Sequence, residues 1–179
     1  MRRVGAACAL ALLCGCNPSV QQSASPSPSP TPTSSGLSLK ISGRGTAQRP
    51  VRFVATNQDR TRVQYDLLAS SFESVGAQGS ARAQFSHVHV TFHGKDGSTL
   101  VAEAPRAIVD QVTNTIRMEG GVRAKNDRGT SLSCDVLTFD HVTEMFYGTG
   151  HVAIVSANGF RATGNTFESN ISLTRTRMQ

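Results

Sequence analysis

The chain has 179 residues, of which 17% are charged and 6% aromatic, with no tryptophan and a formal net charge of +6. The charged fraction lies below the roughly 25% of an average globular protein, and the hydrophobic fraction is 38%. This composition argues against a coiled coil, a helical bundle and a protein with several membrane spans. The positive excess is mild. It favours an anionic partner but is too small to predict nucleic-acid binding.

The first fifteen residues, 1–15, predict an export signal. Met1-Arg2-Arg3 is a short positive segment, and residues 4–13 form an apolar run that is too short for a membrane span of about 20 residues. The run leads into Leu13-Cys14-Gly15-Cys16, which resembles a bacterial lipobox. The resemblance implies that Cys16 is acylated, so that a lipid anchor holds the protein to a membrane outside the cytoplasm. An ordinary secretory signal with incidental cysteines is the alternative.

Residues 16–36 predict the acylated cysteine and a tether, because small polar residues alternate with proline from Ser25 to Thr33 and exclude both helix and sheet. At roughly 3.1 Å per residue, such a tether holds a folded domain up to about 60 Å from the membrane. The predicted domain is residues 37–179. Cys134 is its single cysteine, so we expect no disulfide there and interpret Cys134 as a small core residue, with a reactive thiol as the alternative.

The predicted domain has the alternation of β-strands. Apolar and polar residues alternate from Val88 to Phe92, and no helical periodicity extends beyond two turns. Ala102 to Val109 could form a short helix, but Pro105 and its repeat counterparts favour a strand. Turn signals separate the strands: they are Lys95-Asp96-Gly97, Gly120-Gly121, Asn126 to Gly129 and Asn158-Gly159. We therefore predict an all-β fold.

A repeat of thirty residues organises the second half of the chain. Asp110-Gln-Val-Thr113 returns as Asp140-His-Val-Thr143, and the spacing of residues 129–140 returns in residues 159–170. A period near 30 in β-rich sequence predicts stacked units that share one continuous core. Gly120, Gly148 and Gly150 are expected on the inward face of their strands as kinks or bulges.

These motifs resemble the OstA-like repeats of lipopolysaccharide-transport proteins, and in particular the LptC family. The resemblance covers roughly residues 51–177 and rests on Leu100-x-Ala102, Asp110-x-x-Thr113-x-x-Ile116-x-x-x-Gly120-x-Val122 and Gly129-x-x-Leu132-x-Cys134, preceded by the strand from Phe85 to Phe92. It implies an open, twisted antiparallel β-jellyroll whose two sheets form a V-shaped trough for the acyl chains of lipopolysaccharide.

The resemblance also implies partners and a compartment. The partners are the subunits of an inner-membrane ABC exporter, which delivers lipopolysaccharide, and a bridging jellyroll protein of the same fold, which receives it. The compartment is the periplasm, beside the inner membrane. The best-known members anchor through a transmembrane helix, whereas this chain carries a lipobox, so sorting to the outer membrane stays open.

Ten apolar positions are expected to line the trough. Against them a bound acyl chain would gain about 0.8 kcal/mol per CH₂ removed from water, although the same residues would also form an ordinary closed core. Five nearby cations either meet phosphate groups at the rim or form a solvated face. The apolar positions are Leu100, Ile116, Val122, Leu132, Leu137, Phe139, Phe146, Val152, Ile154 and Phe167, and the cations are Arg106, Arg117, Arg123, Lys125 and Arg128.

The end of the chain predicts an uncovered edge strand. Residues 171–177 alternate apolar and polar residues with no element after them. Such an edge is a template for strand addition, so Ile171, Leu173 and Arg175 are expected to pair with a partner strand. Arg175 and Arg177 give a conflicting signal, because charges on an edge also block unwanted pairing.

Evidence for other classes of function is weak. His87, His89 and His93 share one strand face, but the third lies about 20 Å along the strand, too far to share a metal ion. A polysaccharide-acting enzyme would use Asp110, Asp140 and Glu144, although both aspartates recur as turn residues. We predict no catalysis, cofactor or metal. The remaining alternatives are a free bridge protein and a lipid-anchored structural module without a ligand.

Overall fold

The computed structural model describes residues 39–46, 48–57, 59–76 and 81–179, and these residues form eleven β-strands and no helix. The strands are β1 (Leu39–Arg44), β2 (Val51–Thr56), β3 (Val63–Ala69), β4 (Ser71–Gly76), β5 (Arg82–His93), β6 (Thr99–Asp110), β7 (Thr115–Asn126), β8 (Ser131–Asp140), β9 (Met145–Val155), β10 (Arg161–Asn170) and β11 (Thr176–Met178). The all-β prediction is confirmed, and Ala102 to Val109 is strand. In the described part of the chain, no helix is long and apolar enough to cross a membrane.

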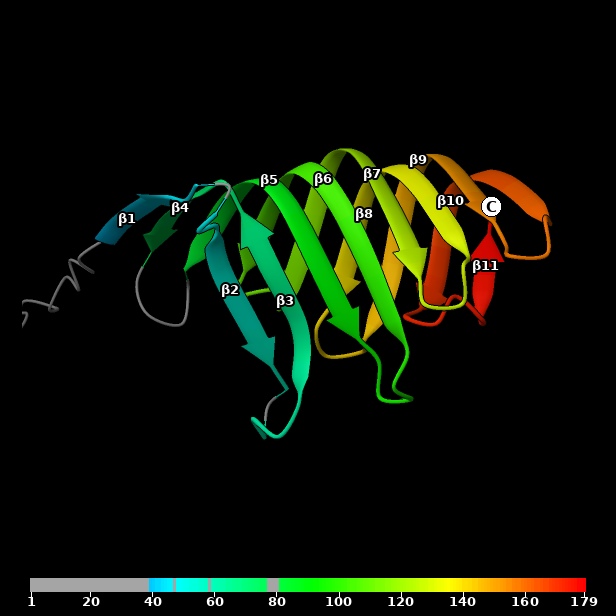
Figure 1. Ribbon diagram of the computed structural model, residues 1–179, viewed down its shortest axis with the longest axis horizontal. Helices are drawn as coiled ribbons and strands as arrows, with labels where there is room; N and C mark the ends of the chain where they lie inside the picture. The colour runs from blue at the N-terminus through cyan, green and yellow to red at the C-terminus, as the bar shows by residue number, and fades with distance from the viewer. Residues whose placement is uncertain (1–38, 47, 58, 77–80) are drawn as a thin grey trace, which may run out of the picture. The chain divides into compact units, whose positions relative to one another are not determined.

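All the strands belong to one open antiparallel sheet. Its order is β1-β4-β5-β6-β7-β8-β9-β10-β11, and the β2–β3 hairpin joins the sheet through the pairing of β3 with β5. The long strands arch over a common ridge, so that their two halves face one another (Figure 1). This is the open jellyroll that the resemblance implied.

The ridge divides the sheet into two walls. Wall A contains β2, β3 and residues 88–93, 99–104, 122–126, 131–134, 152–155 and 161–164. Wall B contains β1, β4, β11 and residues 82–86, 106–110, 115–119, 136–140, 145–149 and 166–170. The strands from β5 to β10 therefore contribute to both walls, whereas β1 to β4 and β11 each contribute to one.

Bulges bend the strands at the ridge. The register shifts between Glu103 and Arg106 in the β6–β7 pair, and the next three pairs shift at equivalent places. Gly120 and Gly121 in β7 have φ of 92° and 90° and lie at this bend, so the expectation that they form a turn between strands is wrong. The extra residues of a bulge leave the pleat and interrupt the inward–outward alternation, so even-numbered residues of β7 and β9 are buried on both sides of the bend but not at the bulge itself. For that reason Gly120 is exposed and Gly150 half-buried, not inward as expected, while Gly148 is buried.

The repeat is visible in the turns at the free ends of wall B. The Asp110 Oδ1 atom accepts hydrogen bonds from the backbone amides two and three residues later, at 2.9 and 3.2 Å. Asp140 repeats this pattern at 2.7 and 3.1 Å, and Asn170 Oδ1 accepts from amides four and five residues later at 3.0 and 3.1 Å. The interpretation of Asp110 and Asp140 as turn residues is confirmed.

The core lies between the walls and is centred on three phenylalanines. Phe92 of wall A has its ring centroid 4.9 Å from that of Phe139 and 4.8 Å from that of Phe146, both in wall B. Such tilted and edge-on pairs add about 0.5–1.5 kcal/mol each to the burial of the rings. Cys134 is also buried, and that burial raises the pKa of its thiol to about 12. These contacts hold the two walls together in the middle of the sheet.

Candidate lipid-binding trough

The ten residues expected to line the trough are brought together by the fold. Five belong to wall A and five to wall B, and each has at most 7% of its surface exposed. They pack on one another and on the phenylalanine cluster as one continuous core. In this structure an acyl chain would therefore have to displace side chains to lie between the walls.

The interior opens at the N-terminal end of the sheet. A groove of about 330 Å³ lies between wall A, which contributes Val51 and Phe53, and wall B, which contributes Phe72, Phe85 and Val109. Phe72 stacks on Phe85 with a centroid distance of 6.0 Å, and Phe53 lies 5.7 Å from Phe85. Phe53 and Phe72 are only half-buried. Here the sheet leaves aromatic surface partly accessible at the entrance to its core.

The strand architecture explains this opening. β2 and β3 belong to wall A alone, and β1 and β4 belong to wall B alone. Each is six or seven residues long, which at about 3.3 Å per residue is too short to cover one wall and continue into the other. Beyond β5, then, the walls are built from separate short strands joined at the ridge: Ser70 alone lies between β3 and β4, and its amide donates to the Ser86 carbonyl oxygen at 2.9 Å. Sequence reasoning missed this groove, although Val51 to Phe53 and Phe72 to Ser74 carry its alternation.

The C-terminal edge differs from the prediction. The expected strand over residues 171–177 is a turn followed by β11, which pairs with β10. Ile171 is buried with 3% of its surface exposed, Leu173 adopts a positive φ of 55°, and Arg175 is exposed just before β11. The physical reason is Asn170, whose side chain holds the turn in place of the strand hydrogen bonds. Docking of a partner strand at this edge stays a prediction.

Polar side chains join the walls on the long side opposite the ridge. Gln64 in β3 donates from Nε2 to the His141 carbonyl oxygen at 3.1 Å and to Glu144 Oε1 at 2.9 Å. Asn126 at the end of β7 donates from Nδ2 to the Ser172 carbonyl oxygen at 2.9 Å. Wall A supplies the donors and the turns of wall B supply the acceptors. The two walls are therefore held together along this side by hydrogen bonds and charge.

Two of the cations expected at the rim form ion pairs away from it. Arg106 and Arg117 both bind Glu119 on the outer face of wall B, at 2.5 and 2.6 Å. Arg117, the larger influence, and Arg106 hold the pKa of the Glu119 carboxyl below its ordinary value. These two arginines therefore face away from the interior, while Arg123 and Lys125 lie exposed on wall A.

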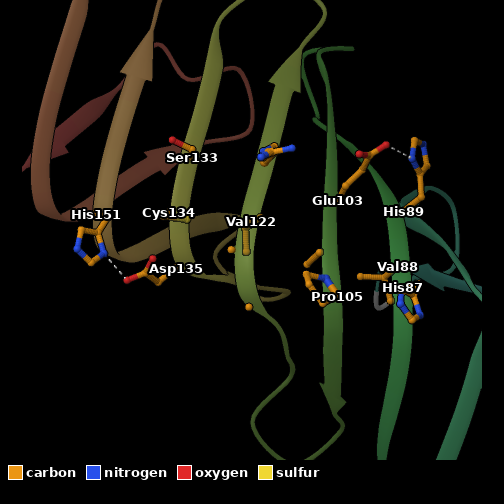
Figure 2. Close-up of a pocket in the computed structure, with 14 residues that line it drawn as sticks. His87, Val88, His89, Glu103, Pro105, Val122, Ser133, Cys134, Asp135 and His151 are labelled. Carbon is orange, nitrogen blue, oxygen red and sulfur yellow. Dashed lines mark hydrogen bonds and ion pairs between the residues drawn. The ribbon is translucent and has the colours of Figure 1, made fainter.

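The outer face of the ridge carries a polar groove of about 730 Å³. Figure 2 shows a histidine–carboxylate pair at each of its two ends: His89 Nδ1 lies 3.2 Å from Glu103 Oε1, and His151 Nδ1 lies 2.7 Å from Asp135 Oδ2. His87 lines the same groove. Among the residues that the structure describes, no three His, Cys, Asp or Glu side chains are grouped as a metal site.

Comparison with known proteins agrees with this architecture. The sequence model of one family, described as "Lipopolysaccharide-assembly, LptC-related", matches residues 9–178. No curated protein matches the chain. The matched region begins well upstream of the residues on which the sequence resemblance rested. It includes the second part of the predicted signal, Cys16 and the whole predicted tether, which lie outside the described residues.

Proposed function

Because the chain belongs to the LptC-related lipopolysaccharide-assembly family, we propose that its trough binds lipopolysaccharide and passes it along an export bridge. Membership makes the chain a component of lipopolysaccharide transport. The finer role is our proposal: the chain receives the glycolipid from an inner-membrane ABC exporter and hands it to a bridging jellyroll protein. The exporter's ATP hydrolysis supplies the energy, and this chain catalyses no reaction.

The apolar groove at the N-terminal end is the observation that carries the proposal. It joins the surface to a core made almost wholly of apolar side chains. An acyl chain entering there loses contact with water at about 0.8 kcal/mol per CH₂, which offsets the cost of moving side chains such as Phe72. The pairs of β3 and β4 with β5 each lie within one wall, so widening of the groove at the Ser70 bend between them would leave these pairs in place.

The anchor and the docking edge belong to the same proposal. Acylation of Cys16 would hold the domain at the periplasmic face of a membrane, as the lipobox-like motif predicts. At the other end of the sheet, β11 pairs with β10 on one side and offers its other side to a partner strand. β11 has only three residues and so offers few positions for pairing. The half of β10 that lies in wall A extends the same C-terminal edge of the sheet.

Photocrosslinking of the full chain in living cells tests the proposal. A photoreactive phenylalanine analogue replaces Phe72, which is half-buried in the groove and tolerates a similar ring better than the closed core does. The matched control is Val75, which lies on the opposite face of the same strand with 45% of its surface exposed. We expect a lipopolysaccharide adduct at Phe72 and none at Val75.

The same measurement then moves inward to Ile116, Val122 and Phe146, with His89 as an outward control. Adducts at these sites would extend the binding path from the groove into the interior. A folded protein that forms no adduct at Phe72 or at any inner site would contradict the transport role. The closed core would then favour a structural, lipid-anchored module.

A further inference from the structure

Glu144 connects the two walls more extensively than any other side chain whose contacts the structure describes. It lies in the β8–β9 turn of wall B, and its side chain is 10% exposed. Its Oε1 atom accepts from Arg62 Nη2 and from Gln64 Nε2, the latter at 2.9 Å, and lies 3.4 Å from Lys95 Nζ. All three donors belong to wall A or to its turns. One carboxylate oxygen therefore joins three side chains of wall A to wall B on the long side of the trough.

The turn itself does not require a glutamate at this position. The equivalent residue thirty positions earlier is Asn114, which adopts nearly the same φ, 53° against 57° for Glu144. Asn114 is exposed, and asparagine is among the residues that accept this conformation most readily. A glutamate here bears more backbone strain than asparagine would. Its contacts with Arg62 and Lys95 give the position a second role.

The surroundings of Glu144 form an anion site. Two cations and an amide converge on one oxygen atom. A cavity of about 290 Å³ lies beside it, and its charged lining residues are Lys95, Asp96, Glu144 and Arg175. Gln64 is 3% exposed, yet its Oε1 atom has no hydrogen-bond partner. A buried acceptor without a partner costs roughly 1–3 kcal/mol. The closed arrangement thus leaves one polar group unsatisfied, which favours a second arrangement of these residues.

Closure at Glu144 also reaches the core. Tyr65 follows Gln64 in β3, and its ring centroid lies 5.7 Å from that of Phe92 and 6.2 Å from that of Phe139. On the other side, the same ring lies edge-on to His141, which precedes Glu144 in the β8–β9 turn. When this turn moves away from β3, the contacts of Tyr65 with wall B are lost, and the phenylalanine cluster is uncovered from the long side.

We propose that Glu144 is a latch: in the lipid-free protein it holds the walls together by occupying an anion site, and a phosphate group of a bound glycolipid takes its place on Arg62 and Lys95. The inference rests on the proposed function and adds to it how the trough opens. A phosphate group carries more negative charge and more acceptor oxygens than a carboxylate. It therefore competes for the same cations while the acyl chains occupy the space between the walls.

A charge-removing variant tests the latch in the full chain. Glu144→Gln keeps the size of the side chain but loses the charge, and the photoreactive analogue is placed in turn at Phe146 in the interior and at Phe72 in the groove. We expect the lipopolysaccharide adduct at Phe146 to increase several-fold and the adduct at Phe72 to change little. Glu119→Gln is the matched control, because Glu119 binds Arg106 and Arg117 within wall B and should leave both yields unchanged.

A second arm tests the phosphate site. Lys95 is 73% exposed, so Lys95→Gln should fold even if a change at Glu144 does not. Purified full-length protein is mixed with lipid A or with dephosphorylated lipid A, and the Phe146 adduct is quantified. We expect dephosphorylation to lower the yield several-fold in the wild type, and Lys95→Gln to lower the yield with lipid A but not the yield with the dephosphorylated lipid.

The outcomes separate this inference from the proposed function. Adducts at Phe72 together with a Phe146 yield that does not respond to Glu144→Gln would overturn the latch and keep the transport role. A Phe146 yield that responds to Glu144→Gln but not to the lipid's phosphates or to Lys95→Gln would overturn the phosphate exchange. Absence of adducts at both sites in every variant would overturn the transport role itself.

Discussion

The two ends of the sheet enclose the apolar core between the walls in different ways. From β5 to β10, each strand runs through both walls, and bulges at the ridge fold it over a closed core (Figure 1). At the N-terminal end, the β2–β3 hairpin extends wall A while β1 and β4 extend wall B. There the walls are joined at the ridge by Ser70, the one residue between β3 and β4, and by the side chains of the groove. The core is thus closed where long strands continue across the ridge and partly open where separate short strands form the two walls.

This difference places binding and stability in separate regions. Phe92, Phe139 and Phe146 are less than 2% exposed within the repeat region, whereas Phe53 and Phe72 remain half-buried at the N-terminal end. A ligand that displaces Phe72 sacrifices little of the buried area that holds the domain together. A ligand that reaches Phe146 disturbs the centre of the core. Entry at the N-terminal end therefore costs the protein least.

Cysteine labelling should reveal the largest contrast between the two regions. Burial raises the pKa of the Cys134 thiol to about 12, whereas a cysteine introduced by Ser74→Cys in the apolar groove should titrate near the ordinary value of about 8.5. At neutral pH the thiolate fractions then differ by about three-thousandfold. Labelling of the folded protein with a thiolate-selective reagent, mapped by peptide mass spectrometry, should modify position 74 first. Comparable rates at both positions would mean that the repeat region opens as readily as the N-terminal end.

Matched truncations of phenylalanine should separate the regions by stability. Phe146→Ala leaves a cavity beside Phe92 and Phe139, and we expect it to lower the free energy of unfolding by about 3–5 kcal/mol. Phe72→Ala removes a half-buried ring at the groove and should cost about 1–2 kcal/mol. Denaturant titration followed by circular dichroism measures both changes. Equal losses would contradict the view that the N-terminal end contributes little to the core.

Much of the repeat region follows from its sequence pattern. The thirty-residue period places Asp110 and Asp140 in turns and directs all ten expected trough residues inward, as the structure confirms. The repeat already matches Asn170 to Asp140, and giving Asn170 the turn role of its counterpart would have predicted the turn in place of an edge strand. Sequence patterns are sufficient to predict these turns, because the side chain that holds each turn bonds to residues close to it in sequence.

Other features depend on contacts that no local pattern contains. Gly120-Gly121 has the composition of a turn, and only the pairing of β7 with two neighbours makes it a bend within one strand. Arg62 and Glu144 are separated by 82 positions, and their contact exists because the sheet folds over the ridge. The apolar groove likewise combines β2 with β4 and β5, which belong to different walls at that end. Such features emerge from tertiary structure.

Substitution at the ridge tests whether the bulges keep the walls closed. Gly150 has a φ of 75°, and a β-carbon there would overlap the carboxylate of Asp135, which binds His151 at 2.7 Å. Gly150→Ala should therefore destabilise the protein by about 1–3 kcal/mol. Gly121, with a φ of 90° and no atom near the position of an added β-carbon, is the control, and Gly121→Ala should cost about 1 kcal/mol. Thermal unfolding of both variants measures the difference, and equal shifts would assign the effect to φ alone.

Lowering the pH should have the smallest effect on stability. The test compares one carboxylate from each region, Asp110 in the repeat region and Asp66 at the N-terminal end. Arg82 is the main influence that holds the pKa of Asp110 below its ordinary value, with help from the Thr113 amide, and Arg52 does the same for Asp66 at the N-terminal end. A carboxyl whose pKa is lower in the folded state stabilises the protein above its unfolded pKa of about 4. That stabilisation is lost as the pH falls through the folded pKa.

Replacement by asparagine isolates the charge, since Asp110→Asn keeps the Oδ1 acceptor that holds the turn. The variant should melt below the wild type near pH 7, and the two melting temperatures should converge as the pH falls below about 4, because the wild-type carboxyl becomes neutral as well. Asp66→Asn should show the same convergence with a smaller difference. Both arginine partners are mostly exposed, Arg52 at 64% and Arg82 at 69%, so solvent screens both ion pairs. The Asp110 side chain is less exposed than that of Asp66, 11% against 24%, and it also accepts two backbone hydrogen bonds. A gap for Asp110→Asn that persists in acid would assign the loss to turn geometry, and a larger gap for Asp66→Asn would place the stronger electrostatic support at the N-terminal end of the sheet.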